Sequence, residues 1–505
     1  MSAPIVETSL GKLQGKAGHG VSVFLGVPYA APPTGERRFA PPEPSPPWTG
    51  VRDATAVGPV APQLPSPLET LLGSRAIVWD EAACLSLNVW TPGTDTAERP
   101  VMVWVHGGAF LNGSSGIPWY DGSRLAREND VVIVTVNYRL GALGFLHLED
   151  VAGPGLTGSG LAGILDQVAA LRWVEENISA FGGDPGNVTV FGESAGGMSV
   201  ATLLALESAR GLFHRAVLQS GAGHNAHTRE DADRITHEFL QALELTSAGA
   251  GTAARLRDLP VSALLEAQGR IGQAYVQRGL AFQPVIDGTT LRDLPVRRVA
   301  AGSAHDVAVL VGTNRDEWNL FAAMDPRSPG LDDAGLLDIA VGVFGDGARA
   351  EAAIAQYRSS RPDDSPGRLL SAMTTDNTFR IPAIRLAEAQ REAGGAAWMY
   401  LFTWPSPVFD GRLGACHAVE IPFVFNNLDR PGADIFVGPD APTALAKAMS
   451  ATWAAFARSG DPSGGALGPW PQYEPRRRTT MVFDVTPHLE EDPMAAERLQ
   501  WDGVK

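Results

Sequence analysis

The sequence predicts an α/β fold built around one large, mostly parallel central sheet with helices on both faces. Short, continuous apolar runs recur along the chain and are separated by helix-like segments, which is typical of strands buried on both faces of a sheet. The 505 residues could form several average domains, but large α/β enzymes often build one domain of this size around a single extended sheet. We therefore expect one domain over residues 1–505.

The predicted strands follow an irregular N-terminal region. Apolar and polar residues alternate over the first forty residues, which predicts an antiparallel hairpin or meander. Prolines then crowd the segment from Pro32 to Pro67 and prevent regular structure there, so we expect an ordered surface loop. The strands predicted for the main sheet are Leu87–Trp90, Val101–Val105, Val131–Val136, Val188–Phe191, Ala216–Leu218, Val307–Val311 and Trp398–Phe402.

Helical periodicity is clearest over Leu161–Asn177, which a Gly-Gly-Asp-Pro sequence at 182–185 follows as a stop signal. Two further helix-rich stretches lie near 229–277 and 332–392. Because both interrupt the strand-forming segments, we interpret them as lid-like insertions that cover the strand ends where substrates bind.

Composition narrows the class of protein. Apolar residues make up 44% of the chain and charged residues 19%, which is typical of a globular protein. The formal net charge of −16 argues against a nucleic-acid partner, because binding phosphates needs a clustered positive surface. No apolar run approaches the roughly 18 to 20 residues that a membrane span needs.

Cellular location is predicted from the N-terminus and the cysteines. The chain does not begin with the basic start and apolar stretch of a secretory signal. Its two cysteines, Cys84 and Cys416, argue against a disulfide framework and fit a reducing compartment. We expect a cytoplasmic protein, with secretion left open if a leader was removed.

The pentapeptide Gly192-Glu193-Ser194-Ala195-Gly196 lies between a strand-like run and a helix-like run. A serine on a sharp strand-to-helix turn brings neighbouring chain very close, so the positions two before and two after it must lack side chains. The turn also presents the hydroxyl beside the free N–H groups of the next helix. This context predicts a serine nucleophile; the alternative is a glycine-rich loop with a solvated serine.

A serine nucleophile needs a base and a third group that fixes the tautomer of that base. His417 follows a predicted strand on a glycine-rich loop and could reach across a cleft; the alternative is a surface or helix-capping histidine. Asp316 and Glu317 are adjacent in the loop after the predicted strand Val307–Val311, where α/β enzymes place working groups. Spacing does not choose between these two carboxylates, and either could be a solvated loop charge.

The segment His106–Phe110 directly follows the predicted strand Val101–Val105. Its small residues would let backbone N–H groups approach a tetrahedral oxyanion, together with the amide of Ala195. The order of serine, acid and histidine along the chain is the order expected of an α/β-hydrolase fold.

With these motifs in place, the chain resembles the type-B carboxylesterases, the family that contains cholinesterases and bacterial p-nitrobenzyl esterases. The resemblance covers nearly the whole chain. It includes Phe24–Ala30, Cys84–Trp90, His106–Phe110, Asn137–Arg139, Phe181–Pro185, Leu218–Gly221 and the segment around His417.

The resemblance implies roles for individual residues. It implies a triad of Ser194 as nucleophile, His417 as general base and Glu317, rather than Asp316, as acid. It implies oxyanion-hole N–H donors at Gly108, Ala109 and Ala195. It further implies an ion pair between Arg139 and Asp166, and supporting positions for Glu193 and Ser220 behind the triad.

The chain departs from the family pattern at two places near these motifs. Ala82 and Ala83 occupy positions where the family has Glu-Asp, so an ion pair from Arg38 is expected to be lost or rerouted, with Glu81 one step away. Trp318 replaces the glycine usual after the acid and would put a large aromatic near it. Five aromatic residues could line an apolar pocket or belong to the core: Trp119, Trp318, Phe321, Phe379 and Phe425.

The expected function is a serine carboxylesterase that hydrolyses small, mostly uncharged carboxylic esters through an acyl-enzyme. Its partner would be a small-molecule ester, and neither a cofactor nor a metal is required. Carbamate or amide hydrolysis and lipase action on the same triad are the alternatives within hydrolases. From another class, the alternative is a non-catalytic binding protein on the same scaffold. The oligomeric state is left open and is compatible with a monomer.

Overall fold

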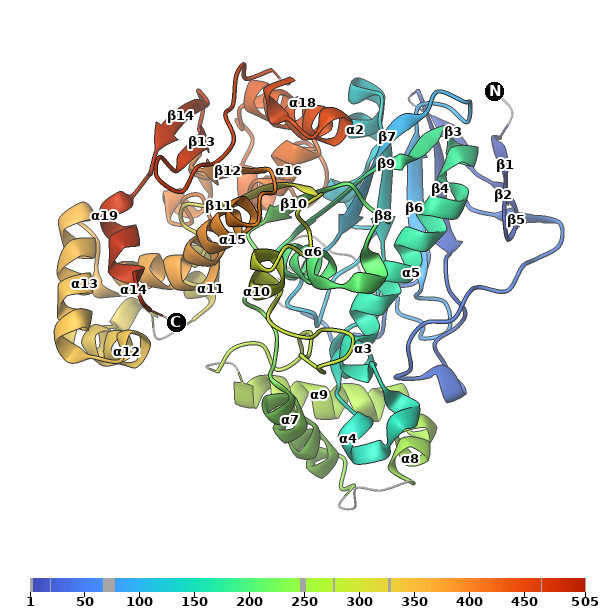
Figure 1. Cartoon of the computed structure of the whole chain (residues 1–505), viewed down its shortest axis with the longest axis horizontal. Helices are drawn as coiled ribbons and strands as arrows, with labels where there is room; N and C mark the ends of the chain where they lie inside the picture. The colour runs from blue at the N-terminus through green and yellow to red at the C-terminus, as the bar shows by residue number, and fades with distance from the viewer. Residues whose placement is uncertain are drawn as a thin grey trace.

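A computed structural model describes residues 3–18, 20–66, 78–245, 251–275, 278–325, 328–464 and 466–504. Over these residues an 11-stranded sheet crosses the molecule (Figure 1). Its strands, in spatial order, are β14 (His488–Glu491), β13 (Thr479–Phe483), β12 (Ala397–Phe402), β11 (Ala308–Asn314), β10 (Arg215–Gln219), β9 (Gly183–Glu193), β7 (Arg99–Val105), β8 (Val132–Val136), β6 (Ser86–Thr91), β4 (Val21–Pro28) and β3 (Lys16–Gly18).

The sheet is parallel through its middle and antiparallel at both edges. All pairings from β8 through β7 and β9 to β13 are parallel, whereas β6, β4 and β3 join in antiparallel pairs, as does β14. The prediction of a large, mostly parallel sheet is confirmed, and each of the seven predicted strands is present. Strands β13 and β14 were not predicted.

The N-terminal region forms the predicted hairpins. Strands β1 (Ile5–Thr8) and β2 (Gly11–Gln14) pair antiparallel, and β5 (Val51–Asp53) completes a separate three-stranded sheet. The proline-rich stretch is largely irregular from Pro32 onward, as predicted, apart from short elements such as β5. Its predicted end, Pro67, lies outside the described residues.

Helices cover both faces of the sheet, and strand β7 shows why. Val101, Val103 and Val105 belong to one core cluster, whereas Met102 and Trp104 belong to another, because alternate residues of a strand point to opposite faces. The first cluster contains apolar residues of α5 (Ala162–Asn177) and α6 (Ala195–Ala205), and the second contains those of α2 (Ser123–Asn129) and α18 (Thr443–Ser459). Burial on both faces thus explains the continuous apolar runs.

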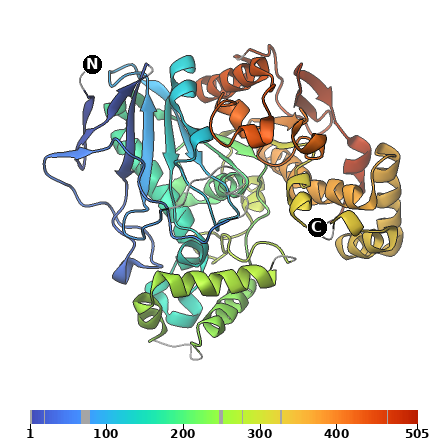
Figure 2. The same cartoon turned by 180° about the vertical axis from the view of Figure 1, so that it is seen from behind.

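The two predicted helix-rich stretches are helical. The first forms α7 (Arg229–Ala242), α8 (Thr252–Asp258) and α9 (Val261–Tyr275), and the second forms α12 (Asp333–Phe344), α13 (Gly347–Ser360), α14 (Pro366–Thr375) and α15 (Ile381–Glu392). Figures 1 and 2 place α7–α9 at the bottom of the molecule and α12–α14 at the side opposite the N-terminal strands. Helix α15 contacts β11 and β12, so it covers the sheet instead of forming part of a lid. A lid role for the other helices stays a prediction.

Two buried arginines connect the N-terminal part of the chain to the rest. Arg139 binds Asp166 through two hydrogen bonds of 2.8 and 2.7 Å, which confirms the expected pair. Arg38 binds Glu81 through two hydrogen bonds of 2.6 Å, so its ion pair is rerouted by one position. Arg38 Nη1 also donates to the carbonyls of Arg257 and Leu259, at the end of α8.

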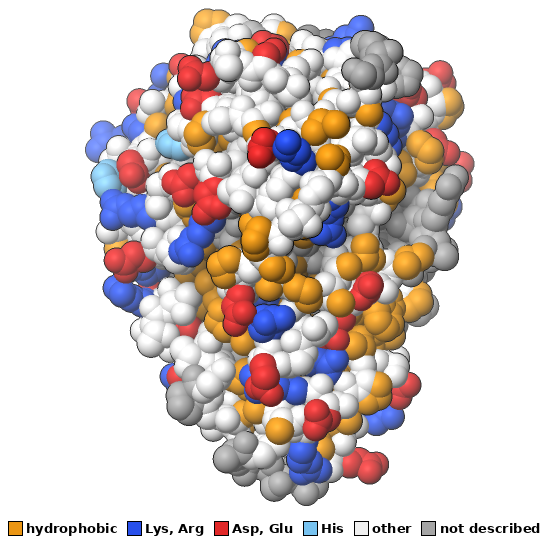
Figure 3. Space-filling view, turned by 90° about the vertical axis from the view of Figure 1, so that its right-hand side faces the viewer, with side chains coloured by type: hydrophobic (Ala, Val, Ile, Leu, Met, Phe, Trp, Pro, Cys, Tyr) orange, Lys and Arg blue, Asp and Glu red, His pale blue; other side chains and the backbone are white. Residues whose placement is uncertain are grey.

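The surface carries charges of both signs. Figure 3 turns the right-hand side of Figure 1 toward the viewer and shows Lys and Arg interspersed with Asp and Glu, with apolar side chains gathered across the middle. The described residues on this face therefore offer no extended basic surface for a nucleic acid. Among the described helices, none combines the length and apolar character needed to cross a membrane.

Candidate active site

Ser194 occupies a strained turn between β9 and α6. Its backbone has φ 57° and ψ −124°, a region that non-glycine residues rarely adopt. A Cβ atom on Gly196 would lie 2.0 Å from the carbonyl oxygen of Val105, and one on Gly192 would lie 2.7 Å from the same oxygen. The neighbouring strand β7 therefore excludes side chains at both positions, which confirms the steric interpretation of the pentapeptide.

The loop after β7 presses against this turn. A Cβ on Gly107 would lie 3.0 Å from Ser194 Cβ and 2.9 Å from Glu193 Oε2. Gly108 and Ala109 follow with φ of 111° and 56°, and turns of this kind present successive backbone N–H groups on one side. Ala195 is the first residue of α6, so its N–H is not used inside the helix. The three predicted oxyanion donors thus lie on the two segments that meet at Ser194.

Glu317 and His417 are hydrogen-bonded to each other. Glu317 Oε2 lies 2.7 Å from His417 Nδ1, and both side chains are buried. The other carboxylate oxygen of Glu317 accepts the backbone N–H of Asn314 at 2.7 Å. Of the two adjacent carboxylates that spacing left open, Glu317 is therefore the one that faces the imidazole, as the resemblance implies.

The other imidazole nitrogen, Nε2, faces the nucleophile turn. It lies 3.0 Å from Oε1 of Glu193, the residue directly before Ser194. The described residues show no hydrogen bond between His417 and the Ser194 hydroxyl. Catalytic hydrogen bonds are often long without substrate and tighten in the complex. The fold therefore brings histidine and acid into direct contact and places the other nitrogen of the histidine against Glu193, the residue next to Ser194.

Three carboxylates determine the electrostatics of the histidine. Burial lowers the pKa of His417, but the charge of Glu193 and the hydrogen bond that His417 donates to Glu317 outweigh burial and raise this pKa to about 9. Burial in turn raises the pKa of Glu193 well above its usual range, and raises the pKa of Glu420 as well. The site is thus built to hold an imidazolium ion once the imidazole has accepted a proton.

A polar network that sequence reasoning missed lies behind the histidine. Glu420 is fully buried and accepts hydrogen bonds from Gln219 at 3.0 Å and from Asn314 at 2.6 Å. Asn314 also donates to the carbonyl of Cys416 at 2.8 Å. The signal in the sequence was a glutamate within the apolar run Ala418–Phe425, because a buried charge requires polar partners.

Aromatic side chains flank the histidine. The rings of Phe379 and Phe321 lie 4.9 and 5.1 Å from the imidazole, and Trp318 lies 4.8 Å from Phe321. Trp318 and Phe321 are half-buried. Together with buried Phe379 they form an aromatic wall beside the histidine. Trp119 and Phe425 belong to the other core cluster. Of the five candidates, Trp318, Phe321 and Phe379 are therefore the ones grouped at the histidine.

Two other groups with possible chemistry are accounted for by their surroundings. Cys416 is buried, and burial raises the pKa of its thiol well above the usual range, which leaves it unreactive. His147, Asp150 and Asp233 are the one cluster of potential metal ligands among the described residues. Asp150 already binds the guanidinium of Arg229 with both oxygens, so we interpret this cluster as an ion-pair network.

Comparison with known proteins gives the family of the chain. The model of a family described as the carboxylesterase family matches residues 2–501. The para-nitrobenzyl esterase of Bacillus subtilis is 41% identical, and the alignment covers 99% of this chain and 98% of the relative. The phenmedipham hydrolase of Pseudarthrobacter oxydans is 38% identical over 94% of this chain and 93% of its own length.

Solved structures give the same result. The crystal structure of a Geobacillus stearothermophilus carboxylesterase at pH 6.2 superimposes with a TM-score of 0.88 at 42% identity, covering 98% of this chain and 99% of that one. The fold is therefore the α/β-hydrolase fold of the carboxylesterases, as predicted.

Proposed function

This chain belongs to the carboxylesterase family and is a carboxylic ester hydrolase, and from that premise we propose that Ser194, His417 and Glu317 hydrolyse small, mostly uncharged esters. The observation that carries the proposal is the 2.7 Å contact between buried Glu317 and His417 Nδ1, because it leaves Nε2 of the imidazole on the side of Glu193, the residue directly before Ser194.

The proposed reaction proceeds through an acyl-enzyme. His417 Nε2 accepts the proton of the Ser194 hydroxyl while the serine oxygen attacks the ester carbonyl, and the imidazolium then gives this proton to the leaving alkoxide. In the second half, His417 takes a proton from a water molecule as the water oxygen attacks the acyl carbonyl. The imidazolium then returns this proton to the Ser194 oxygen as the bond between that oxygen and the acyl carbon breaks, which releases the carboxylic acid and restores the serine hydroxyl. Glu317 accepts the Nδ1–H throughout, which fixes the tautomer and stabilises the imidazolium.

The oxyanion would be bound by backbone N–H groups of Gly108, Ala109 and Ala195. Donors of this kind act where charge develops, and removing one typically costs about 3 to 4 kcal/mol of barrier. This chemistry needs neither a metal nor a cofactor, because every proton and charge is managed by the protein.

The wall of Trp318, Phe321 and Phe379 supports uncharged substrates with an apolar or aromatic group. A carbamate is a second candidate substrate, because its carbonyl accepts the same attack and because one relative is named phenmedipham hydrolase.

Two further proposals concern the chain as a whole. We treat it as one catalytic domain, because the proposed triad combines residues from β9–α6, from the loop after β11 and from the segment 413–420. We also propose a cytoplasmic location, which the two free, buried cysteines support.

The test is Ser194→Ala. Hydrolysis of a short-chain p-nitrophenyl ester should fall by about 10⁴- to 10⁶-fold, while the thermal unfolding temperature stays close to that of the unchanged protein. A fluorophosphonate probe should label Ser194, identified by peptide mass mapping. Substantial turnover by the variant, or a label on another residue, would contradict the proposal.

A further inference from the structure

We propose that Asp316 is a positioning residue that holds the loop of the general base, a role distinct from that of its neighbour Glu317. The inference rests on the proposed function, because it takes His417 as the base. The Asp316 carboxylate does not contact the imidazole. Sequence spacing alone did not show whether Asp316 or Glu317 is the triad acid.

Asp316 binds the backbone two residues before His417. Its carboxylate oxygen Oδ2 accepts the N–H of Ala415 at 2.9 Å, and its own backbone N–H donates to the carbonyl of Ala415, also at 2.9 Å. The next residue, Glu317, accepts the N–H of His417 with its backbone carbonyl at 3.3 Å. The acid loop, which carries Asp316 and Glu317, and the base loop, which carries Ala415 and His417, are therefore joined as a short ladder. Asp316 contributes a side-chain acceptor to this ladder for a backbone N–H of the base loop.

The glycine beside Ala415 shows how closely this carboxylate fits. Gly414 has φ of 59°, and a Cβ atom on it would lie 2.5 Å from Asp316 Oδ2. Glycine is needed here both for the left-handed backbone and for the approach of the carboxylate. The neighbouring turn is fixed from the other side, since Asn319 Nδ2 donates to the carbonyl of Leu413 at 3.1 Å.

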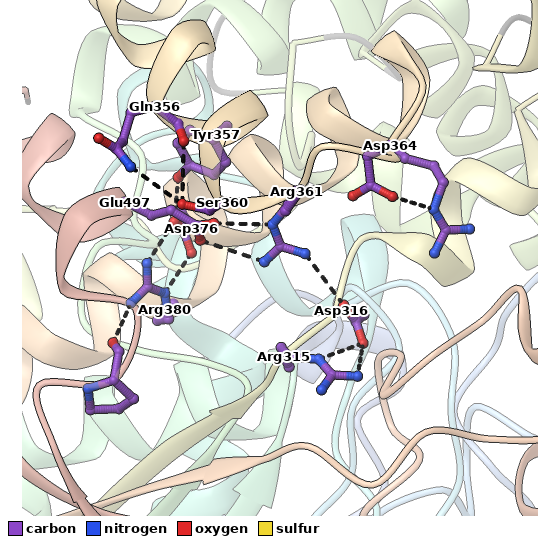
Figure 4. A network of polar contacts seen from close by, with 12 residues as sticks. Arg315, Asp316, Gln356, Tyr357, Ser360, Arg361, Asp364, Asp376, Arg380 and Glu497 are labelled. Atoms are coloured by element: carbon purple, nitrogen blue, oxygen red, sulfur yellow. Dashed lines mark hydrogen bonds and ion pairs between the residues drawn. The ribbon is translucent and has the colours of Figure 1, made fainter.

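Asp316 is itself held by two arginines. Arg315 Nε donates to Oδ2 at 3.1 Å, and Arg361 Nη1 lies 3.9 Å from Oδ1. Arg361 also donates to Glu497 of helix α19 (Ala495–Arg498) at 3.1 Å. Its guanidinium therefore lies between Asp316 and this helix (Figure 4). These groups border a cavity of about 510 Å³ behind the acid loop. The carboxylate is thus anchored from outside the site and directed at the base loop.

Loss of this anchor would act on the rate of the chemical step. Ala415 is two residues from His417, so a shift of this backbone moves the imidazole relative to Ser194. A displacement of about 1 Å in a catalytic group can cost roughly a hundredfold in rate. The Asp316 carboxylate is engaged with the backbone of Ala415 and with two arginines, so we expect KM to change little.

The experiment compares Asp316→Ala with Asp316→Asn, using active-site titration with a fluorophosphonate so that kcat is expressed per working site. Alanine removes the acceptor of the Ala415 N–H, and kcat should fall by about ten- to a hundredfold with KM within about twofold. Asparagine keeps an acceptor oxygen at the same place, so it should restore kcat to within about threefold.

Asp364→Ala is the matched control. Asp364 borders the same cavity and pairs with Arg368 at 3.1 Å. Because this carboxylate is engaged with a helix side chain and not with the backbone of the base loop, kcat and KM should both stay unchanged. If Asp316→Ala does not fold, Gly414→Ala tests the same contact from the other side and should lower kcat per titrated site.

Each outcome is decisive. A kcat per site that Asp316→Ala, or Gly414→Ala in its place, leaves within twofold overturns the positioning role, as does an activity loss that appears only as fewer titratable sites. Peptide mapping separates the two proposals: a label on a residue other than Ser194 contradicts the proposed function, whereas a label on Ser194 with unchanged kcat contradicts only the role of Asp316.

Discussion

The nucleophile and the general base are held in place by different kinds of interaction. Around Ser194 the constraints are steric and come from backbone: Gly192 and Gly196 pack against the carbonyl of Val105. Around His417 they are polar and come from side chains of separate segments, among them Asn314, Asp316 and Glu420. The turn that holds the nucleophile is encoded in one short motif, whereas the polar network that holds the general base forms only when distant segments meet.

This difference predicts two kinds of sensitivity. A backbone contact cannot be relieved by a side-chain rotation, so an added methyl group at the nucleophile turn should damage the fold itself. A polar network can lose one member while the chain around it stays folded, so substitutions near the base should damage the rate first. Variants on the two sides therefore separate stability from catalysis.

The largest effect is expected from Gly196→Ala. The added Cβ would lie 2.0 Å from the carbonyl oxygen of Val105, and inserting atoms into a packed region commonly costs about 1 to 3 kcal/mol and sometimes more. Because the opposing atom is backbone, we expect at least about 3 kcal/mol of lost unfolding free energy and no detectable esterase activity. Chemical denaturation and phosphonate labelling measure both.

Gly272→Ala is the control for this variant. Gly272 lies in α9 with open space around its would-be Cβ, and alanine in a helix is more stable than glycine by about 0.5 to 1 kcal/mol. This variant should be slightly stabilised and fully active. A stable, active Gly196→Ala variant would show that the nucleophile turn is not fixed by its backbone contacts.

The next effect, Glu317→Gln, tests the polar side. Glutamine keeps the size of the side chain but presents an amide that can donate to Nδ1 and favour the wrong tautomer of His417. The equivalent change in a serine protease triad lowers kcat by about 10⁴-fold, and we expect a loss of about 10³- to 10⁴-fold here with an unfolding temperature close to normal.

Asp316→Asn is the matched variant at the adjacent carboxylate, and it should keep kcat within about threefold. The pair of variants decides which carboxylate orients the imidazole. A larger loss in Asp316→Asn than in Glu317→Gln would reverse the assignment.

The same contrast accounts for what the sequence could predict. The central strands and the nucleophile turn follow from local patterns, because continuous apolar runs and closely spaced glycines are each compatible with few local structures. Strand β14 was missed because all of its residues are exposed, so it has no apolar run. Strand β13 was missed because it follows directly on the basic residues Arg476 to Arg478, which indicate a solvated loop.

Local sequence patterns could not predict the polar contacts around the general base, and the reason is physical. Asp316 and Glu317 are neighbours, and which of them faces the histidine depends on how the loop turns after β11. Gln219 contacts Glu420 across about 200 positions of sequence, and no local pattern indicates such a pairing. A glutamate in an apolar run shows that partners must exist without showing which residues they are.

The smallest effect is a change in pH dependence from Glu193→Gln, which tests how the two halves interact. Glu193 belongs to the nucleophile motif, yet its carboxylate lies 3.0 Å from His417 Nε2 and helps to raise the pKa of the imidazole. The base must be neutral to accept the serine proton, so a raised pKa moves the acid limb of kcat/KM to higher pH. Glutamine removes the charge and lowers the pKa of His417. The acid limb should therefore move to lower pH by about one unit, which corresponds to about a tenfold higher fraction of neutral base at acid pH.

A pH profile of kcat/KM measures this shift. Glu207→Gln is the control, because Glu207 is exposed and its carboxylate pairs with Arg292, from which it lies 3.2 Å. That control should reproduce the original profile. If the acid limb of Glu193→Gln stays where it was, the carboxylate does not act on the free base, and the nucleophile motif contributes geometry alone. If the acid limb moves as expected, Glu193 of the nucleophile motif sets the pKa of the general base, and the motif contributes electrostatics as well as geometry.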